Sequence, residues 1–179
     1  MNIQKIHSLF LINNSVSIDT RNIRSKDIFF AIRGPNFNAN MFINEAIEKG
    51  CSYVISDDKK ISMESDKIIY VKDTIVALQD LANFHRRFLK IKIIAITGSN
   101  GKTTSKELIY NVLKSRYNTT ATKGNLNNQL GVPLTLLSMN KETEIGIIEM
   151  GANHLREIDF LCKIAEPDFG YITNFGNAH

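Results

Sequence analysis

The sequence predicts an α/β protein with a small N-terminal α/β domain followed by a parallel-sheet domain of the P-loop type. Two observations support this fold class. Strand-like apolar runs alternate with helix-like segments along the chain, and a glycine-rich turn that ends in lysine joins one strand to the next helix. The chain has 179 residues, 43% of them hydrophobic, so it can hold one domain or two small ones.

The N-terminal half shows the rhythm of a small α/β domain, which we place at residues 1–89. Its predicted elements are a strand at 28–32, a short helix at about 42–49, and strands at 52–55 and 68–71. The first strand ends at the Gly34-Pro35 turn, and Gly50 is a natural residue to follow the end of the helix. This order of elements predicts strand pairing that is at least partly parallel.

A longer helix is predicted to begin at Asp73-Thr74, which form a good N-cap, and to lead into the second domain. The side chains expected to face inward from it are Ile75, Leu78, Leu81, Ala82 and Phe88. His85-Arg86-Arg87 is expected on the polar, solvated face of this helix rather than in a nucleic-acid groove.

The second half, residues 90–179, predicts a doubly wound parallel sheet. Its elements are a strand at 91–96, a helix to about Tyr117, a strand at 144–150, a helix at about 154–165 and a strand at 169–173. Apolar side chains recur at helical spacing in both helices: Leu108, Ile109, Val112 and Leu113, then Leu155, Ile158, Leu161, Cys162 and Ile164. Ligands bind at the carboxyl ends of such strands, so residues 98–102, Glu149 and residues 174–179 should converge on one crevice.

The chain stops at His179, directly after a strand and without a helix to close the sheet. We therefore expect the second domain to be incomplete and the chain to be a truncated part of a longer protein.

Residues 97–104 read Thr-Gly-Ser-Asn-Gly-Lys-Thr-Thr, and their place between a strand and a helix predicts a phosphate cradle. Gly98 and Gly101 allow a tight turn that brings backbone N–H groups to an anion. Lys102 adds a cation, the helix N-terminus adds a partial positive charge, and Thr103 offers a hydroxyl to a Mg²⁺ held between phosphates. The spacing is GxxGKT, shorter than the common P-loop, which would need glycine in place of Ile96.

The composition favours a cytoplasmic protein, and its charge suits an anionic substrate. No apolar run approaches the ~20 residues of a membrane span, and the N-terminus lacks the apolar core of a signal peptide. The formal net charge is +4, but the basic residues are scattered, which suits an anionic substrate better than nucleic acid. Cys51 and Cys162 stand in apolar contexts and are expected to be ordinary buried thiols.

Three separated motifs occur in a characteristic order: residues 97–104, then Glu149-Met-Gly-Ala-Asn153, then Ile172-Thr-Asn-Phe-Gly-Asn-Ala-His179. In identity and order they resemble the Mur ligases, the ATP-dependent amide ligases of peptidoglycan precursor synthesis. Residues 122–137 resemble most the branch of the family that adds D-alanyl-D-alanine to UDP-N-acetylmuramoyl-tripeptide. Asp19-Thr20-Arg21, followed by residues 27–34, resembles the unit of the family that binds the UDP end of the substrate.

The resemblance implies ATP and Mg²⁺ as cofactors, and an amide-forming reaction of cell-wall synthesis that passes through an acyl phosphate. The phosphate-binding residues would be Gly98, Ser99, Asn100, Gly101, Lys102, Thr103 and Thr104. The catalytic residues would be Lys102, Glu149 and His179, and the metal ligands Thr103, Glu149 and His179. The UDP-linked tripeptide would be bound by Thr20, Arg21, Asn125, Asn127 and Asn128. A carbamylated lysine of the family should lie beyond His179.

The residues alone leave plainer alternatives open. Glu149 could be a surface carboxylate in a turn, the Asn-rich segment at 125–128 a polar turn, and Thr20 with Arg21 the site of a strand-edge ion pair. The function could be that of another Mur-type ligase, of a folylpolyglutamate- or cyanophycin-type ligase, or of a non-catalytic nucleotide-binding fragment. Arg156 departs from the family, which often has glycine there. We expect this chain alone to be inactive, and the full-length protein to be a monomer without nucleic-acid or membrane partners.

Overall fold

The computed structural model describes residues 2–13, 15–34 and 37–176, and it divides into two compact units, Met1–Leu81 and Ala82–His179. The division lies inside helix α3 (Thr74–Leu89), eight residues before the boundary that the sequence predicts after residue 89. The last turns of α3 belong to the second unit because their side chains bond to it. Asn83 donates to the Ile164 carbonyl at 2.9 Å, and Arg86 pairs with Asp168 at 2.9 Å.

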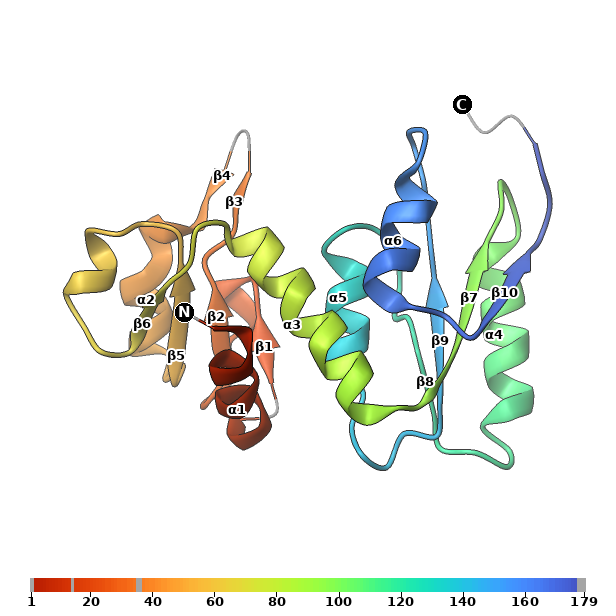
Figure 1. Cartoon of the computed structure of the whole chain (residues 1–179), viewed down its shortest axis with the longest axis horizontal. Coiled ribbons are helices and arrows are strands. Elements are labelled where there is room, and N and C mark those ends of the chain that lie inside the picture. Colours follow the sequence, from red (N-terminus) through yellow and green to blue (C-terminus); the bar gives the residue numbers. More distant parts are fainter. Residues whose placement is uncertain (1, 14, 35–36, 177–179) are drawn as a thin grey trace. The chain divides into compact units, whose positions relative to one another are not determined.

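The first unit contains a parallel sheet in the order β1-β2-β5-β6 (Figure 1). Its strands are β1 (Val16–Ser17), β2 (Ile28–Phe30), β5 (Tyr53–Ser56) and β6 (Ile68–Tyr70). All three pairings are parallel, which confirms and sharpens the predicted α/β unit. A separate antiparallel pair joins β3 (Arg33–Gly34) to β4 (Phe37–Asn38).

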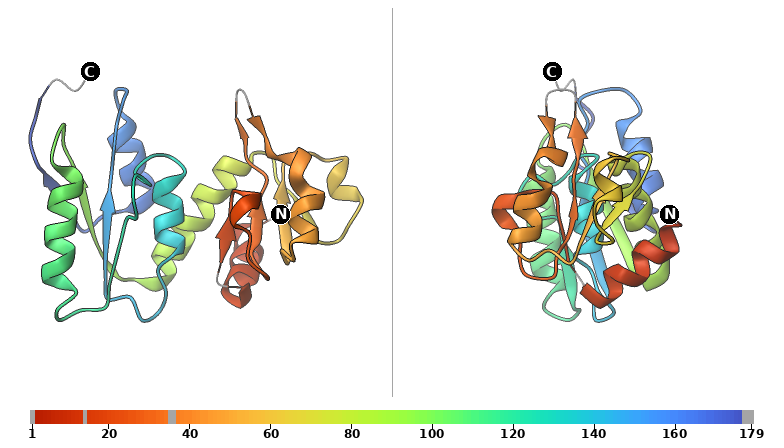
Figure 2. Two further views of the ribbon diagram at one scale, coloured as in Figure 1. Left: turned by 180° about the vertical axis from the view of Figure 1, so that it is seen from behind. Right: turned by 90° about the vertical axis from the view of Figure 1, so that its left-hand side faces the viewer.

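Helices cover both faces of this first sheet (Figure 2, right). They are α1 (Ile3–Asn13) and α2 (Ile43–Glu48), with single 3₁₀ turns at Thr20–Asn22, Ala39–Phe42 and Ile61–Met63. Ile43 of α2 packs in one cluster with Phe29 and Val54 of the strands. The sequence did not predict the α1 helix. This helix buries Ile6 and Phe10, which stand at the i, i+4 spacing of one helix face.

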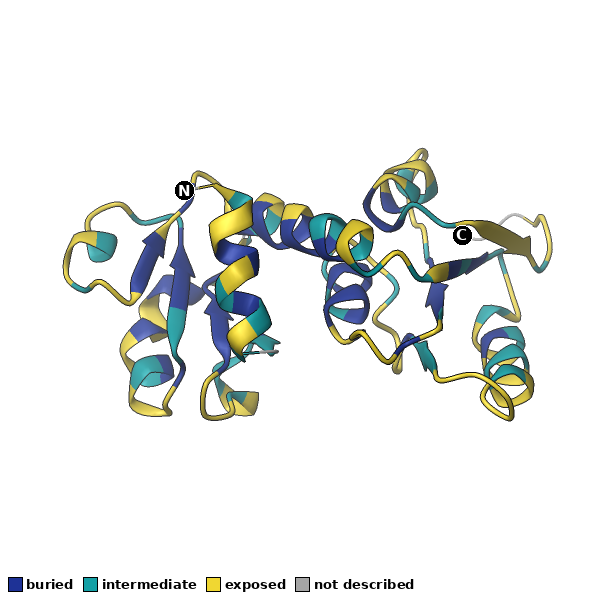
Figure 3. Ribbon diagram, turned by 60° about the horizontal axis from the view of Figure 1, so that its bottom comes forward, coloured by how far each residue is buried: buried dark blue, intermediate teal, exposed yellow. Residues whose placement is uncertain are grey.

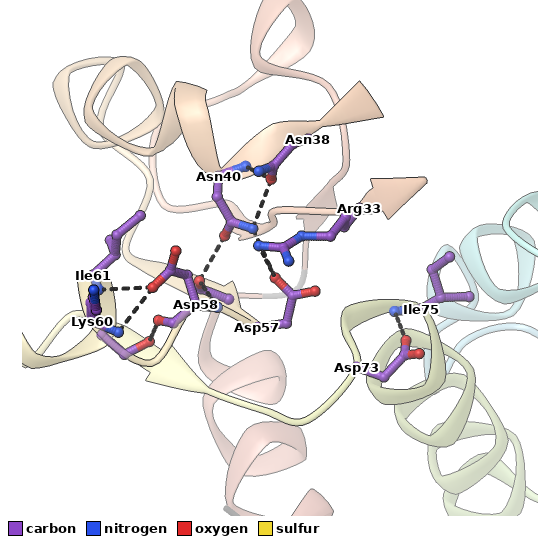
Figure 4. A network of polar contacts seen from close by, with 11 residues as sticks. Arg33, Asn38, Asn40, Asp57, Asp58, Lys60, Ile61, Asp73 and Ile75 are labelled. Atoms are coloured by element: carbon purple, nitrogen blue, oxygen red, sulfur yellow. Dashed lines mark hydrogen bonds and ion pairs between the residues drawn. The ribbon is translucent and has the colours of Figure 1, made fainter. Parts of the chain in front are cut away.

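A buried polar network lies at the carboxyl end of β5 (Figure 4). The Asn40 side chain is 5% exposed, and its amide nitrogen donates to Asn38 at 2.9 Å and to Asp57 at 2.8 Å. Its amide oxygen accepts from the Ser56 hydroxyl at 2.7 Å, and Arg33 lies 3.4 Å from Asp57. These bonds satisfy the buried amide and connect the β3–β4 pair to the end of the sheet.

The second unit also contains a parallel sheet, in the order β10-β7-β9-β8. Its strands are β7 (Lys92–Thr97), β8 (Thr119–Ala121), β9 (Ile145–Glu149) and β10 (Phe169–Ile172). Helix α4 (Lys102–Leu113) lies on one side of this sheet, and α5 (Gly131–Leu137) with α6 (Glu157–Ala165) on the other (Figure 1). The doubly wound prediction is confirmed, but it did not include β8 and α5.

Several apolar side chains that recur at helical spacing in the sequence are exposed, and Figure 3 shows α4 as intermediate or exposed along most of its length. Phe88 is 42% exposed near the end of α3, with the Lys141 ammonium 5.7 Å from its ring centre. Leu108 and Val112 of α4 are 64% and 71% exposed, so the apolar pattern of that helix does not mark a buried face in this chain. Leu155 is 97% exposed because α6 begins only at Glu157.

The basic group at the end of α3 is not a solvated face, as the sequence reading expected. His85 is 2% exposed, and its Nε2 lies 2.9 Å from the Met139 carbonyl, so this nitrogen carries the proton. The Arg86 guanidinium donates to the carbonyls of Ala165 and Glu166 at the end of α6. Only Arg87 keeps a largely exposed side chain, and it pairs with Glu166.

The two cysteines differ in burial. Cys51 is buried as expected, whereas Cys162 is intermediate, and both are free thiols. Burial raises the pKa of both thiols, so neither is activated as a thiolate.

Among the helices of the described residues, none combines the length and the hydrophobicity of a membrane span.

The buried imidazole of His85 predicts a loss of stability in mild acid. Burial lowers the pKa of His85 below its ordinary value of 6.5, so the unfolded chain takes up this proton at a higher pH than the folded one. The stability that depends on a neutral His85 is therefore fully present above about pH 6.5. It is lost as the pH drops through and below that value. We expect the midpoint temperature of thermal unfolding to be lower at about pH 5.5 than at about pH 7.5. This difference should be smaller in His85→Gln, which keeps a donor for the Met139 carbonyl.

The control for this measurement is His154→Gln, which removes an exposed histidine. Equal slopes in the wild-type chain and His85→Gln would contradict the assignment of the acid sensitivity to His85.

Candidate phosphate and metal site

The turn between β7 and α4 has the backbone geometry that its two glycines predict. Gly98 has φ +138° and Gly101 has φ +76°, conformations that L side chains rarely adopt. A Cβ atom at Gly98 would stand 2.1 Å from the Thr173 hydroxyl oxygen, so no side chain fits there. Gly101 is the N-cap of α4, which places the positive end of the helix at the loop.

Lys102 is folded back over this loop. Its ammonium donates to the Gly98 carbonyl at 2.7 Å and lies 3.3 Å from the Ser99 carbonyl. The charge therefore already lies at the loop, held by groups that carry no formal charge. A phosphate oxygen is a stronger acceptor than a carbonyl, so a bound anion can draw the ammonium from these two carbonyls.

The segment after β10 braces the same loop, as the predicted convergence of strand ends requires. The Asn174 amide oxygen accepts the backbone N–H groups of Ser99 and Asn100, both at 3.0 Å. The Thr173 hydroxyl donates to the Asn100 carbonyl at 2.6 Å, and the Ser99 hydroxyl donates to the Gly176 carbonyl at 2.7 Å. His179 and the two residues before it lie outside the described residues.

Glu149 is buried at the end of β9, which excludes the alternative of a surface carboxylate. It is 2% exposed, and its Oε1 accepts from the Asn127 side chain at 2.9 Å. Its backbone N–H donates to the Thr122 hydroxyl at 3.0 Å. Its Oε2 has no hydrogen-bond partner among the described residues and lies 3.8 Å from the Lys106 ammonium.

Lys106 is a buried residue beside Glu149 that the sequence motifs did not single out. Its side chain is 1% exposed, and its ammonium donates to the Thr122 carbonyl at 2.8 Å and lies 3.0 Å from Glu107 Oε1. The available signal is its spacing: it follows Lys102 by four residues, so both stand on one face of α4. Because exposed lysines at that spacing are ordinary, the signal does not reveal the burial.

The Asn-rich segment is held by hydrogen bonds within its unit, and its contact with substrate stays a prediction. The Asn127 amide group donates to Glu149, and its backbone carbonyl accepts from the N–H of Gly151 at 2.8 Å. The Asn128 side-chain oxygen accepts the N–H groups of Leu130 and Gly131 at the start of α5, both at 3.0 Å. Asn125 is exposed. The segment is therefore a structured turn, and Asn127 and Asn128 also line a cavity.

This cavity, of about 460 Å³, lies beside the phosphate loop. Lys102 and residues 127–129 line one part of it, and residues 151–153 with Glu157, Phe160 and Leu161 of α6 line the rest. Its volume falls within the ~300–1,000 Å³ of ordinary small-molecule sites. The backbone N–H groups of Asn153 and His154 donate to Glu157 and lower the pKa of that carboxyl, which keeps it charged.

In the first unit, Thr20 and Arg21 lie in the single 3₁₀ turn after β1. The Arg21 guanidinium binds Asp19 at 2.7 Å and holds the pKa of that carboxyl at about 2. The Thr20 carbonyl accepts from the Lys49 ammonium at 3.0 Å. The ion pair that the sequence analysis kept as the alternative is therefore present, and the Arg21 side chain remains 84% exposed.

The residues described around Glu149 fit a Mg²⁺ ion better than a transition metal. The described part of the chain holds no group of three His, Cys, Asp or Glu side chains that could bind a metal. Mg²⁺ needs no such cage, since it takes one or two protein oxygens and completes its shell with phosphate oxygens and water. The unbonded Oε2 of Glu149 and the exposed Thr103 hydroxyl are such oxygens.

Comparison with known proteins agrees with the resemblance found in the motifs. Residues 96–179 match the Mur ligase middle domain. The chain is 40% identical over 167 residues to the UDP-N-acetylmuramoyl-tripeptide–D-alanyl-D-alanine ligase of Bacillus subtilis, covering 93% of this chain and 36% of the relative. It is 35% identical over 166 residues to the enzyme of that name from Escherichia coli, covering 93% of this chain and 36% of the relative.

Solved structures give the same result. MurF from Acinetobacter baumannii superposes with a TM-score of 0.85 at 38% identity, covering 92% of this chain and 36% of that chain. The MurF ligase from Thermotoga maritima in complex with ADP gives a TM-score of 0.83 at 36% identity, covering 94% of this chain and 39% of that one. The chain thus spans a little over a third of the length of these relatives, and its resemblance to the Mur ligases, and to MurF among them, is confirmed.

Arg156, where the family often has glycine, has φ +68° at the N-cap of α6. An L side chain in this conformation costs about 1–2 kcal/mol, and glycine removes most of that cost. We therefore expect Arg156→Gly to raise the free energy of unfolding by about 1 kcal/mol in denaturant titrations. Arg156→Ala is the matched control, since it removes the same side chain but keeps Cβ. An equal gain in both variants would show that backbone strain is not the cause.

Asn174→Asp should weaken phosphate binding while the fold is retained. The aspartate carboxylate would accept the same two N–H groups more strongly than the amide oxygen and would repel a phosphate. We expect ATP affinity to fall by at least about tenfold, or ~1.4 kcal/mol, in calorimetric titration. Asn140→Asp is the control, because it makes the same charge change in the turn before β9, at the opposite edge of the sheet. Equal losses in the two variants would contradict the role of Asn174.

Proposed function

We propose, from the relationship of this chain to the Mur ligases, that it supplies the UDP-substrate-binding and ATP-binding parts of an amide ligase. The reaction is the addition of D-alanyl-D-alanine to UDP-N-acetylmuramoyl-tripeptide, a step of peptidoglycan precursor synthesis. The observation that carries the proposal is the braced phosphate loop beside a buried carboxylate and a polar cavity. The ADP in the related T. maritima MurF supports a nucleotide as the ligand of the loop.

The loop and the start of α4 would bind the terminal phosphates of ATP. The N–H groups of Ser99 and Asn100 and the ammonium of Lys102 are the donors, and the helix N-terminus adds its partial charge. All three donors are occupied by weaker acceptors: the Asn174 amide and two loop carbonyls. Binding therefore exchanges neutral partners for charged ones, and the loop is already folded when the nucleotide arrives.

Thr103 and Glu149 would hold the Mg²⁺ ion, with His179 as a further ligand by resemblance to the family. Bound Mg²⁺ supplies positive charge between the phosphate oxygens, which favours phosphoryl transfer. The chain contributes the position of the carboxylate: the amide of Asn127 holds Oε1, so that Oε2 is the oxygen left for the metal.

The cavity beside the loop would take the end of the peptide that reacts. There the carboxylate of the tripeptide takes the γ-phosphoryl group of ATP, and the amine of D-alanyl-D-alanine displaces phosphate from the acyl phosphate. The products are the amide, ADP and inorganic phosphate. Asn125, Asn127 and Asn128 would contact this substrate, while Thr20 and Arg21 would bind its UDP end. The exposed Arg21 guanidinium is suited to a diphosphate, which it can bind without leaving Asp19.

The proposal is tested by calorimetric titration of this chain with UDP-N-acetylmuramoyl-tripeptide and, separately, with Mg·ATP. We expect saturable binding of both ligands, with ATP binding lost in Lys102→Ala because the variant removes the cation of the loop. Lys163→Ala, which removes an exposed lysine of α6, is the control for net charge. ATP binding without tripeptide binding would leave the nucleotide site but refute the substrate, and binding of neither ligand would refute both. A cytoplasmic location stays a prediction of the sequence.

A further inference from the structure

The buried lysine of α4 has no part in the function proposed above. We propose that Lys106 is a positioning residue: its ammonium balances the charge of Glu149 and fixes that carboxylate relative to α4, so that Oε2 is available to a divalent cation. This inference rests on the proposed role of Glu149 as a metal ligand. Lys106 itself touches neither the phosphates nor the metal in this proposal and acts only through Glu149.

The burial of Lys106 is the first observation. Lysine is almost never fully buried unless it is paired, and this side chain is 1% exposed. The partners of its ammonium are the Thr122 carbonyl at 2.8 Å, Glu107 at 3.0 Å and Glu149 at 3.8 Å. Glu107 is 55% exposed and can be solvated by water, whereas Glu149 is 2% exposed and cannot. The buried carboxylate is therefore the partner that depends on the ammonium.

The bonding of Glu149 is the second observation. A buried carboxylate is costly unless a cation and hydrogen bonds compensate it. Asn127 bonds Oε1, and Lys106 is the one cation within ion-pair distance in the described part of the chain. At 3.8 Å the ammonium balances the charge without forming a hydrogen bond to Oε2, so that oxygen remains free to bind a metal.

The place of Lys106 in the fold is the third observation. It stands one helical turn after Lys102 and Thr103, so its helix also carries the phosphate-binding and proposed metal-binding side chains. Its other firm contact is the Thr122 carbonyl directly after β8, and the Thr122 hydroxyl accepts from the backbone of Glu149. One ammonium thus links α4 to the ends of β8 and β9, which sets the distance between Thr103 and Glu149.

A purely structural role, in which the ammonium only satisfies the Thr122 carbonyl, predicts different results. Lys106→Gln separates the two roles, because glutamine keeps an N–H donor for Thr122 but removes the charge. Glu149→Gln removes the charge of the partner, and the double variant removes both charges together. Lys114→Gln is the matched control: it makes the same change at an exposed lysine at the end of the same helix.

Thermal unfolding without any ligand is the first readout. We expect Lys106→Gln to lower the midpoint and the double variant to recover at least half of that loss, since no uncompensated charge remains buried. Additive losses would overturn the proposal. Where Lys106→Gln fails to fold, recovery of folding in the double variant supports the proposal, and failure of both overturns it.

The Mg²⁺ dependence of ADP binding is the second readout. We expect Lys106→Gln to raise the Mg²⁺ concentration for half-maximal enhancement of ADP binding at least tenfold, with the affinity in excess EDTA changed less than twofold. Lys114→Gln should change neither. Equal losses with and without Mg²⁺, or a lower Mg²⁺ requirement, would overturn the positioning role. A wild-type chain that binds no nucleotide refutes the proposed function, whereas the unfolding comparison still decides the coupling of Lys106 to Glu149.

Discussion

Parallel pairing of β10, β7 and β9 is the constraint from which the site follows. Ile96 pairs with Glu149 on one side of the central strand, and Thr97 pairs with Ile172 on the other. Because the strands run in the same direction and end in register, the loops that follow them emerge at one edge of the sheet. The phosphate loop, the buried carboxylate and the bracing segment after β10 come together for this reason, although they are separated widely along the chain.

The hydrogen bonds that hold the phosphate loop are also the ones that a bound phosphate would replace under the proposed function. The loop N–H groups are paired with Asn174, and the Lys102 ammonium is paired with carbonyl oxygens. The Lys102 ammonium is half-buried, so its bonds to the loop carbonyls satisfy a polar group that water reaches only in part. Under the proposed function, these neutral acceptors would hold the loop in shape and would be replaced by a charged phosphate, which combines pre-organisation with binding.

The buried charges obey the same rule more strictly. Glu149 is tolerated inside the unit because an amide and an ammonium compensate it, and the ammonium is tolerated because it also bonds a strand-end carbonyl. Removing one member of this group would leave a buried polar or charged group without its partner, which costs the full desolvation free energy of that group. Backbone strain is stored nearby as well, since Arg156 keeps a left-handed conformation at the start of the helix that borders the cavity.

The sequence by itself determined the alternation of strands and helices, the strand–loop–helix of the phosphate site and the position of Glu149 at a strand end. These features depend on neighbouring residues in the sequence: apolar runs, glycines that permit a left-handed backbone, and the spacing of the lysine that follows them. It did not reveal α1, β8 or α5. It also placed Phe88 on an inward face and Leu155 within the last helix, whereas Phe88 is 42% exposed and α6 begins after Leu155.

Tertiary structure alone decided which polar groups are buried and which partner each one has. Lys106 with Thr122, Asn127 with Glu149, and Ser99 with Asn174 are contacts between residues 16, 22 and 75 positions apart. Periodicity describes the surroundings of a residue within one helix or strand, and it contains no information about what another strand end brings to it. From the sequence, a lysine on a helix is therefore expected to be exposed. Only the tertiary structure shows that neighbouring strands bury Lys106 and bring its charge to Glu149.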